Sequence, residues 1–166
     1  MPPLKVNPVV PPDVMAKPMA GQACPCGRFS ASTKPVVAKP LPAKLLVAKP
    51  LMFAACCARY LDNFESTPAP DAESLMRSRY CAFTLNRTDY LQATWHKSTR
   101  PADVSQGDGT KWLGLEVRRH VLMDADHAQV EFVARCRMAG RGARIHELSR
   151  FVRELGRWYY VDGDLL

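Results

Sequence analysis

Proline is distributed so unevenly along this chain that it decides where regular secondary structure can form. Eleven of the fourteen prolines lie within residues 1–55. Each proline fixes φ and lacks a backbone N–H, so such a segment cannot sustain a helix or the middle of a sheet. The segment also repeats itself, as V-M-A-K-P-M at 14–19, V-V-A-K-P-L at 36–41 and L-V-A-K-P-L at 46–51. A repeat this short does not suit a solenoid, so we interpret it as a local duplication within an irregular segment.

Helical periodicity begins only after this segment. Asp71 is a favourable N-cap, and apolar residues follow it at intervals of three and four. These residues are Ala72, Leu75, Met76, Tyr80 and Phe83. A second, shorter helix is predicted from Thr88 or Asp89 to Trp95, and the stretch 96–111, with a proline and two glycines, is predicted to be a loop.

The periodicity then changes to the alternation of apolar and polar residues that is typical of strands. The alternating apolar residues are Leu113, Leu115, Val117 and Val121, and then, after a turn at 124–127, Val130, Phe132, Ala134, Cys136 and Met138. Turns at 140–142 and 155–156 predict two further strands, over 145–152 and 158–161.

Helices followed by antiparallel hairpins predict an α+β fold, in which N-terminal helices pack on one face of a curved antiparallel sheet. We expect this domain to span residues 67–166. Residues 1–66 should form a mostly irregular segment that carries cysteines and, at about 30–52, the repeat-containing insertion.

The positive charge of the chain belongs to the N-terminal segment. Of the net charge of +7, residues 1–64 hold +6, from eight Lys/Arg and two acidic residues. Their lysines are dilute and aromatic residues are scarce, so we do not expect nucleic-acid binding beyond salt-sensitive attachment. No run approaches the roughly 20 apolar residues of a membrane span. Six cysteines are too few and too unevenly spaced for a secreted disulfide scaffold, so we expect a cytoplasmic protein.

Four of the cysteines form two pairs, Cys24 and Cys26 in C-P-C-G, and Cys56 and Cys57 in C-C. Four thiolates are a suitable ligand set for zinc, and Arg28 and Arg59 would offset the negative charge of such a site. The alternative is four ordinary reduced thiols in an irregular segment. Cys81 and Cys136 lie within apolar patterns, and we expect them to be buried, inert thiols.

Together with the two cysteine pairs, several motifs resemble the bacterial YchJ family. They are A-E-S-L-M-R-S-R-Y-C-A-F, T-D-Y-L-Q-A-T-W-H-K-S-T-R-P, W-L-G-L-E-V, H-E-L-S-R-F-V-R-E and G-R-W-Y-Y-V-D-G-D. The resemblance covers nearly everything from Cys56 to the C-terminus. It implies a SEC-C-type zinc motif joined to a nuclear transport factor 2-like (NTF2-like) domain. By the same resemblance the ligands of a structural Zn²⁺ would be Cys24, Cys26, Cys56 and Cys57.

The 29 residues between Cys26 and Cys56 make a longer loop than such motifs usually have. Loop closure costs about (3/2)RT ln n, so a loop three to four times longer adds only about 1 kcal/mol. A structural zinc ion contributes about 10–16 kcal/mol in small peptide sites. We therefore expect the insertion to be compatible with the metal site.

A cleft at the open end of the sheet is a second candidate site. Its candidate residues, which are polar groups in apolar patterns and their aromatic neighbours, are Arg77, Tyr80, Trp95, His96, His146, Glu147 and Ser149. Glu147 could act as a general base with His146 or His96 as its acid partner. The structural alternative, which we favour, is a buried ion pair between Glu147 and Arg77. His120 and His127 are expected to face solvent.

These features favour a non-enzymatic zinc-binding adaptor or ligand-binding protein. The zinc module would contact another protein, and the α+β cleft would hold a small molecule. The alternative function is a hydrolase or isomerase that uses the cleft. NTF2-like domains often dimerise through the open face of the sheet, so the resemblance also makes a homodimer possible.

Overall fold

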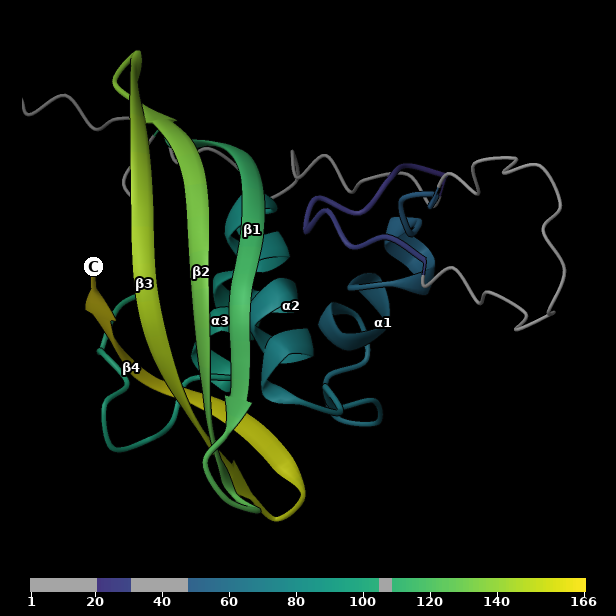
Figure 1. Cartoon of the computed structure of the whole chain (residues 1–166). Coiled ribbons are helices and arrows are strands. Elements are labelled where there is room, and N and C mark those ends of the chain that lie inside the picture. The colour runs from purple at the N-terminus through teal and green to yellow at the C-terminus, as the bar shows by residue number, and fades with distance from the viewer. Residues whose placement is uncertain (1–20, 31–47, 105–108) are drawn as a thin grey trace, which may run out of the picture.

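A computed structural model describes residues 21–30, 48–104 and 109–166. Most of the repeat-containing insertion and the basic residues before Gly21 lie outside the described residues. The rest forms a four-stranded antiparallel sheet in the order β1-β2-β3-β4, with helices on one face (Figure 1). The predicted α+β class is confirmed.

The first long helix, α2 (Ala72–Thr84), begins where its capping residue predicts. The Asp71 carboxylate accepts a hydrogen bond of 2.6 Å from the backbone N–H of Ser74. At the other end Asn86 adopts a positive φ of 54°, and the Arg87 N–H donates to the Ala82 carbonyl at 2.9 Å. This is a Schellman-type C-cap, in which asparagine takes the position usually held by glycine.

The second helix, α3 (Thr88–Ala93), ends two residues before the predicted Trp95. Its following residues instead bond to the last strand, β4 (Arg157–Leu165). The His96 N–H donates to the Tyr160 carbonyl at 2.7 Å, and the Tyr160 N–H donates to the Thr94 carbonyl at 2.9 Å. These bonds draw the backbone out of the helix and fix the end of α3 to the sheet.

We call residues 21–30 and 48–61 the Cys-bearing segment. It contains the short helices η1 (Phe53–Ala55) and α1 (Ala58–Leu61). Its two parts are joined by backbone hydrogen bonds of 2.8 Å from Cys24 to Leu51, from Leu51 to Arg28 and from Phe53 to Gln22. The ends of the insertion therefore lie side by side, and its length does not separate the two cysteine pairs.

The strands are β1 (Lys111–Leu122), β2 (His127–Met138), β3 (Arg141–Glu154) and β4. The predicted third and fourth strands, 145–152 and 158–161, were too short. Two-residue turns with positive φ at Ala139 and Gly140, and at Leu155 and Gly156, let the neighbouring strands pair up to the turn. Such turns match the twist of a hairpin, so pairing extends further than the apolar alternation alone indicates.

Two irregularities in β1 change which residues face the helices. Register shifts lie between Trp112 and Gly114 and between Val117 and Arg119. Leu113, predicted to share a face with Leu115, is 54% exposed as a result. His120, predicted to face solvent, pairs opposite the buried Val130, and its Nε2 atom is buried without a hydrogen-bond partner among the described residues. A β-bulge inverts the alternation in this way, and the sequence pattern did not reveal it.

The core lies between the helices and the inner face of the sheet, the face that the helices cover. Leu75, Leu91, Val130 and Phe151 are almost fully buried there. The cysteines of the Cys-bearing segment belong to the same buried cluster. Figure 1 shows this segment beside α2, away from the centre of the sheet. Among the described residues, no helix is both long and apolar enough to cross a membrane.

Candidate metal centre

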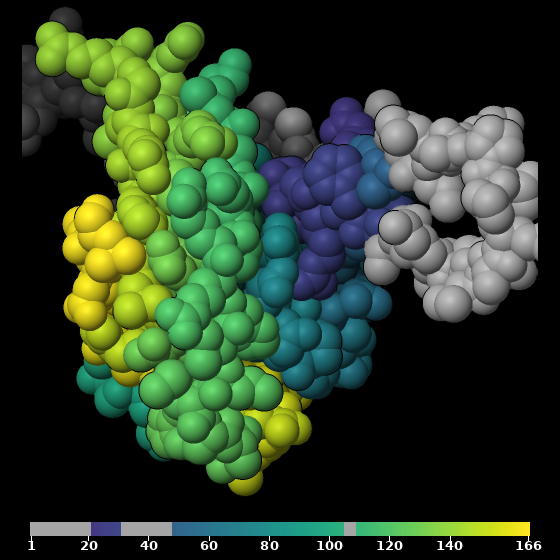
Figure 2. Space-filling model, viewed as in Figure 1, coloured from purple at the N-terminus to yellow at the C-terminus, as the bar shows by residue number. Residues whose placement is uncertain are grey.

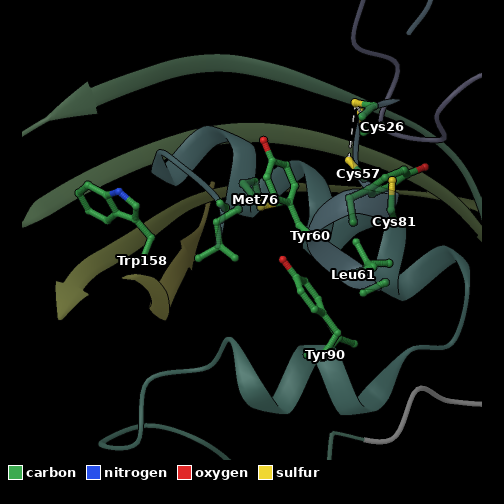
Figure 3. Packing of buried hydrophobic residues seen from close by; sticks show 14 of the residues in the cluster. Cys26, Cys57, Tyr60, Leu61, Met76, Cys81, Tyr90 and Trp158 are labelled. Atoms are coloured by element: carbon green, nitrogen blue, oxygen red, sulfur yellow. Dashed lines mark hydrogen bonds between the residues drawn. The ribbon is translucent and has the colours of Figure 1, made fainter. Parts of the chain in front are cut away.

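Five buried cysteines meet where the Cys-bearing segment packs on α2. Sulfur–sulfur distances are 3.6 Å for Cys24–Cys81, 3.7 Å for Cys26–Cys56 and 3.9 Å for Cys56–Cys57. The ligand atoms of Cys24, Cys26, Cys57 and Cys81 all lie within 4.8 Å of one another. Figure 3 shows the sulfurs of Cys26, Cys57 and Cys81 together at one end of the buried cluster.

The spacing of these sulfurs suits a single tetrahedral metal ion. A Zn–S bond is about 2.3 Å, which places the corners of a tetrahedron about 3.8 Å apart. The three sulfur–sulfur distances lie within about 0.2 Å of that value. They are also far longer than the roughly 2.05 Å of a disulfide, and all six cysteines are free. The donor set therefore fits a thiophilic ion such as zinc.

Local backbone geometry places each thiol. In the C-P-C-G turn the Gly27 N–H donates to the Cys24 carbonyl at 3.0 Å, and Gly27 has a φ of 67° that favours glycine. This turn directs Cys24 and Cys26 inward, since both are nearly fully buried. Cys56 and Cys57 lie between η1 and α1, where the chain folds back toward the same point.

An ion-pair bridge holds the Cys-bearing segment on α2. Glu73 accepts hydrogen bonds from Arg77 at 2.7 Å and from Arg28 at 3.2 Å. Arg77 also donates to the backbone carbonyl of Cys26 at 3.0 Å. Burial acts to raise the pKa of Glu73, but the two guanidinium groups lower it on balance. Arg28 also donates to the Ser74 hydroxyl on α2 at 3.2 Å, whereas Arg59 stacks on the ring of Tyr60. That these two arginines offset the charge of a metal site stays a prediction.

Without a metal the thiols share their protons unequally. Hydrogen bonds lower the pKa of Cys26; the one with Cys24 has the largest effect, and those with Cys56 and Cys57 have smaller effects. The pKa values of Cys56 and Cys57 are raised, mainly by their hydrogen bonds with Cys24 and to a smaller extent by those with Cys26. A bound cation would replace these shared protons, since metals bind the thiolate form.

The structure assigns Cys81 to this cluster, which the sequence did not predict. Cys81 is fully buried, as expected, but its neighbour is the Cys24 sulfur rather than an apolar core alone. The spacing of the sequence could have predicted where Cys81 faces. It follows Glu73 and Arg77 at intervals of four residues, so all three lie on one stripe of α2. Cys136, on β2, is buried elsewhere and lines an apolar cavity.

The residues predicted to form one pocket are scattered, so that prediction is wrong. Arg77 faces the Cys-bearing segment and does not pair with Glu147. His146 is on the outer face of the sheet, where its Nε2 lies 2.8 Å from the Glu131 carboxylate. His96 bonds to Glu154 at 3.1 Å at the far end of β3. Neither histidine is therefore placed to act with Glu147.

Glu147 instead belongs to a small polar network on the inner face. Its Oε1 atom accepts hydrogen bonds from Ser149 at 2.6 Å and from Tyr160 at 3.2 Å. Gly163 makes room for this carboxylate, because a Cβ there would lie 2.2 Å from the same oxygen. The two neighbours explain how a carboxylate is tolerated between Ile145 and Phe151.

Two cavities of about 360 Å³ each lie on the domain. The more apolar one lies between α2, the loop before β1, and the inner face of the sheet. Its lining residues are Phe83, Trp95, Pro101, Asp103, Val104, Thr110, Trp112, Cys136, Met138 and Ile145. The other is lined by polar groups that include His96, His127, Arg150 and Asp162. Of the predicted pocket residues, Trp95 thus lines one cavity and His96 the other.

Comparisons with known proteins match the NTF2-like domain and most of the rest of the chain. A family model described as "YchJ, middle NTF2-like domain" matches residues 71–163. A UPF0225 protein of a Polaromonas species is 59% identical over 147 residues, which cover 88% of this chain and 95% of the relative. A UPF0225 protein of Polaromonas naphthalenivorans is 63% identical over 142 residues, covering 85% of this chain and 96% of that relative.

A solved structure supports the same assignment. The crystal structure of a SEC-C motif containing protein from Psychrobacter arcticus matches with a TM-score of 0.65 and 30% sequence identity. The match covers 86% of this chain and 82% of that one. The predicted NTF2-like fold and the resemblance seen in the sequence motifs are thereby confirmed, and the chain belongs to the YchJ family.

Proposed function

We propose that this protein is a non-enzymatic adaptor whose Cys-bearing segment is ordered by one structural zinc ion. The observation that carries the proposal is the gathering of five buried thiols at the spacing of tetrahedral ligands. A structural zinc site is closed by four protein ligands, which leaves no position for a substrate. Such a site contributes folding free energy to a segment that has little apolar core of its own.

The first test is metal content. Protein purified under reducing conditions should contain one zinc ion per chain, measured by elemental analysis and native mass spectrometry. Cys26→Ser should lower that content well below half, because it removes a fully buried thiol at the centre of the cluster. Cys136→Ser is the matched control, since it removes an equally buried thiol outside the cluster. Zinc-free wild-type protein would refute the proposal.

The adaptor role implies a protein partner for the surface beside the metal centre. Phe29 is 57% exposed and Met52 is 41% exposed, and they lie on the two paired arms of the Cys-bearing segment. Figure 2 shows that this segment packs beside the helices and β1 and is exposed on the surface of the molecule. Exposed large apolar side chains on an ordered metal module suit contact with another protein. Because all six cysteines are free thiols, we place this function in the reducing cytoplasm.

Binding of a small molecule is a second candidate function, favoured by the apolar cavity. Three aromatic side chains, Phe83, Trp95 and Trp112, line it together with Ile145. A cavity of about 360 Å³ falls in the range of ligand sites. The hydrolase or isomerase alternative has less support, because Glu147 lines neither of the two cavities described above and both predicted acid partners lie elsewhere.

A further inference from the structure

We infer that the outer face of the sheet, at the end where β2 turns into β3, binds the phosphate backbone of a double-stranded nucleic acid. The side chains that carry this inference form a basic patch, which consists of Lys111, Arg135, Arg137 and Arg144. The inference goes beyond the proposed function, because it uses the folded domain and needs neither a metal ion nor the Cys-bearing segment.

Strand pairing gathers the basic patch from residues that are far apart in the chain. Arg135 lies directly opposite Arg144. Arg137 lies directly opposite Lys111. Residues directly opposite in an antiparallel pair share a face, and so do residues two apart on one strand. The shared face is the outer one, because Cys136, between Arg135 and Arg137, lines the cavity on the inner face.

The charge of the basic patch is exposed and largely uncompensated. All four residues are exposed. Arg135 pairs with Glu116 at 3.3 Å, whereas the other three make no ion pair with any residue that the structure describes. Like charges directly opposite on a sheet are unfavourable. The Arg135–Arg144 pair is therefore a cost to the fold that an anionic partner would relieve.

Positive and negative charges are separated within the domain. Residues 65–166 contain fifteen basic and fourteen acidic residues. Five of the basic residues lie at this end, since Arg141, the first residue of β3, adds to the four of the basic patch. The rest of the domain is therefore net negative, and such a separation produces a local positive potential that attracts polyanions. Figure 1 shows this end of β2 and β3 projecting beyond the helices, so the helices do not cover it.

The guanidinium groups favour phosphate as the bound group. Three of the four side chains are arginines, which donate two parallel hydrogen bonds to a phosphate and stay charged at any physiological pH. Arg135 and Arg137 are two residues apart on one strand, or about 7 Å. They can therefore reach separate phosphates, as a partner with a repeating phosphate backbone requires.

The surroundings of the basic patch favour a double helix over other polyanions. Neighbouring positions on this face are Gly114, Gly142 and the fully buried Val133, and the His146 ring is held by Glu131 at 2.8 Å. A protein partner would need an exposed apolar anchor near the centre of its interface. Unpaired bases would need free aromatic rings on which to stack. The basic patch offers neither, which suits a partner whose bases are paired and whose phosphates are on the outside.

A second copy of the chain fits the basic patch less well. Carboxylates farther along the same face are already engaged, Asp162 and Asp164 by Arg150 and Glu131 by His146. A two-fold dimer through this face would therefore bring either these engaged groups or a second basic patch against the first.

The first test measures binding of the full wild-type chain to a fluorescein-labelled 20-base-pair DNA duplex by fluorescence anisotropy. With about three phosphate contacts, the logarithm of the affinity should fall with the logarithm of the salt concentration with a slope of about −3. The double variant Arg137→Gln, Arg144→Gln should bind about tenfold or more weakly at low salt, with a slope of about −1. An affinity and slope equal to those of wild type would overturn the inference.

The double variant Lys97→Gln, Arg153→Gln is the matched control, since it removes two exposed positive charges at the other end of the sheet. We expect its affinity to stay within about threefold of wild type. Both double variants keep the N-terminal lysines. Equal losses in the two would therefore show attachment by net charge alone and refute a site at the basic patch.

Thermal melts check that the patch variant is folded. It should melt at or slightly above the wild-type temperature, because it removes the repulsion between Arg135 and Arg144. A clearly lower melting temperature would show that these arginines stabilise the sheet, which contradicts the uncompensated charge on which the inference rests.

Two competitors and one spectrum identify the partner and the place. The unlabelled duplex should displace the probe better than the matching single strand or polyglutamate at the same concentration of charge. Better displacement by either of these would overturn the inference. In NMR spectra of the wild-type chain, the side-chain Nε–Hε signals of Arg137 and Arg144 should shift when the duplex is added. Shifts confined to the N-terminal lysines would refute it.

Discussion

Glu73 is the residue on which the attachment of the Cys-bearing segment depends. Its carboxylate is shared by Arg28 and Arg77, and both contacts are partly buried. Pairs of this kind contribute more than exposed ones, because less solvent screens them. Removing the charge leaves two guanidinium groups without their common partner.

Glu73→Gln should therefore lower stability at neutral pH by about 1 kcal/mol, or about 2–4 °C in Tm. The pKa of Glu73 is lowered in the folded state, so its contribution is present above the ordinary carboxyl pKa of about 4.3 and is lost as pH falls through the folded value. Thermal melts of wild type and variant should thus differ at pH 7 and converge at the acidic end, near about pH 3.

Glu116→Gln is the matched control for that experiment. Glu116 pairs with Arg135 at 3.3 Å, but both side chains are about half exposed. We expect a change below about 0.5 kcal/mol at any pH. Equal effects of the two substitutions would show that the Glu73 bridge does not hold the segment.

Arg79 is a buried cation that has no ion pair among the residues that the structure describes. Its guanidinium donates to the Leu91 carbonyl at 2.9 Å and to the Thr94 hydroxyl at 2.8 Å. It also lies 5.1 Å from the ring centre of Trp95 and 4.6 Å from that of Tyr160. Burial lowers its pKa to about 10, so it stays charged at neutral pH. These contacts join α2, α3 and β4 through one side chain.

At the scale of elements, α2 is the part of the fold that serves both halves of the molecule. Its apolar side packs on the sheet, through residues such as Leu75 and Tyr80. Its polar stripe of Glu73, Arg77 and Cys81 meets the Cys-bearing segment. A weakened α2 should therefore disturb the metal centre as well as the core.

Asp71→Ala tests this dependence, because it removes the N-cap of α2 without touching a cysteine. We expect a loss of about 1 kcal/mol, seen as a Tm lower by about 2–4 °C in calorimetry. Asp71→Asn should retain most of the stability, since asparagine caps a helix about as well as aspartate. If Asp71→Ala melts like wild type, the 2.6 Å bond to Ser74 contributes nothing to the helix.

At the scale of the whole molecule, the outer face of the sheet bears on assembly. Polar and charged pairs cover this face, among them the Glu131–His146 contact at 2.8 Å and the Arg150–Asp164 ion pair at 2.6 Å. Hydrogen bonds to two carboxylates raise the pKa of Arg150, and the bond to Asp164 has a larger effect than the bond to Asp162. A homodimer through the sheet, as the family resemblance implies, stays a prediction, and its interface would have to accommodate these charges.

The apolar cavity forms only when the chain is folded, because its walls come from α2, the loop before β1 and three strands. The fluorescent dye anilinonaphthalene sulfonate, an anion with large apolar rings, should bind the cavity of the folded protein through those rings. Ile145→Phe, which fills the cavity, should weaken that binding about tenfold, or about 1.4 kcal/mol. Leu113→Phe, on an exposed part of β1, is the control and should leave the affinity unchanged. Equal binding by all three proteins would place the dye elsewhere.

The sequence by itself determined the order of the helices and strands from α2 to β4. Asp71 marked the start of α2, the alternation from Val130 to Cys136 marked β2, and Gly140 and Gly156 marked the hairpins. These features depend on neighbouring residues, whose spacing and turn preferences are local properties of the chain. The C-P-C-G and C-C pairs were equally visible, because ligand motifs are short.

The tertiary structure alone decided which distant groups meet. The bulges that turn Leu113 outward and bring His120 inward arise from pairing between strands, which no single strand encodes. Packing of the Cys-bearing segment on α2 brought Cys81 to within 3.6 Å of Cys24, although 57 positions separate them in the chain. The same packing kept Arg77 away from Glu147. Contacts of this kind follow from how whole surfaces fit together, and local periodicity carries no record of that fit.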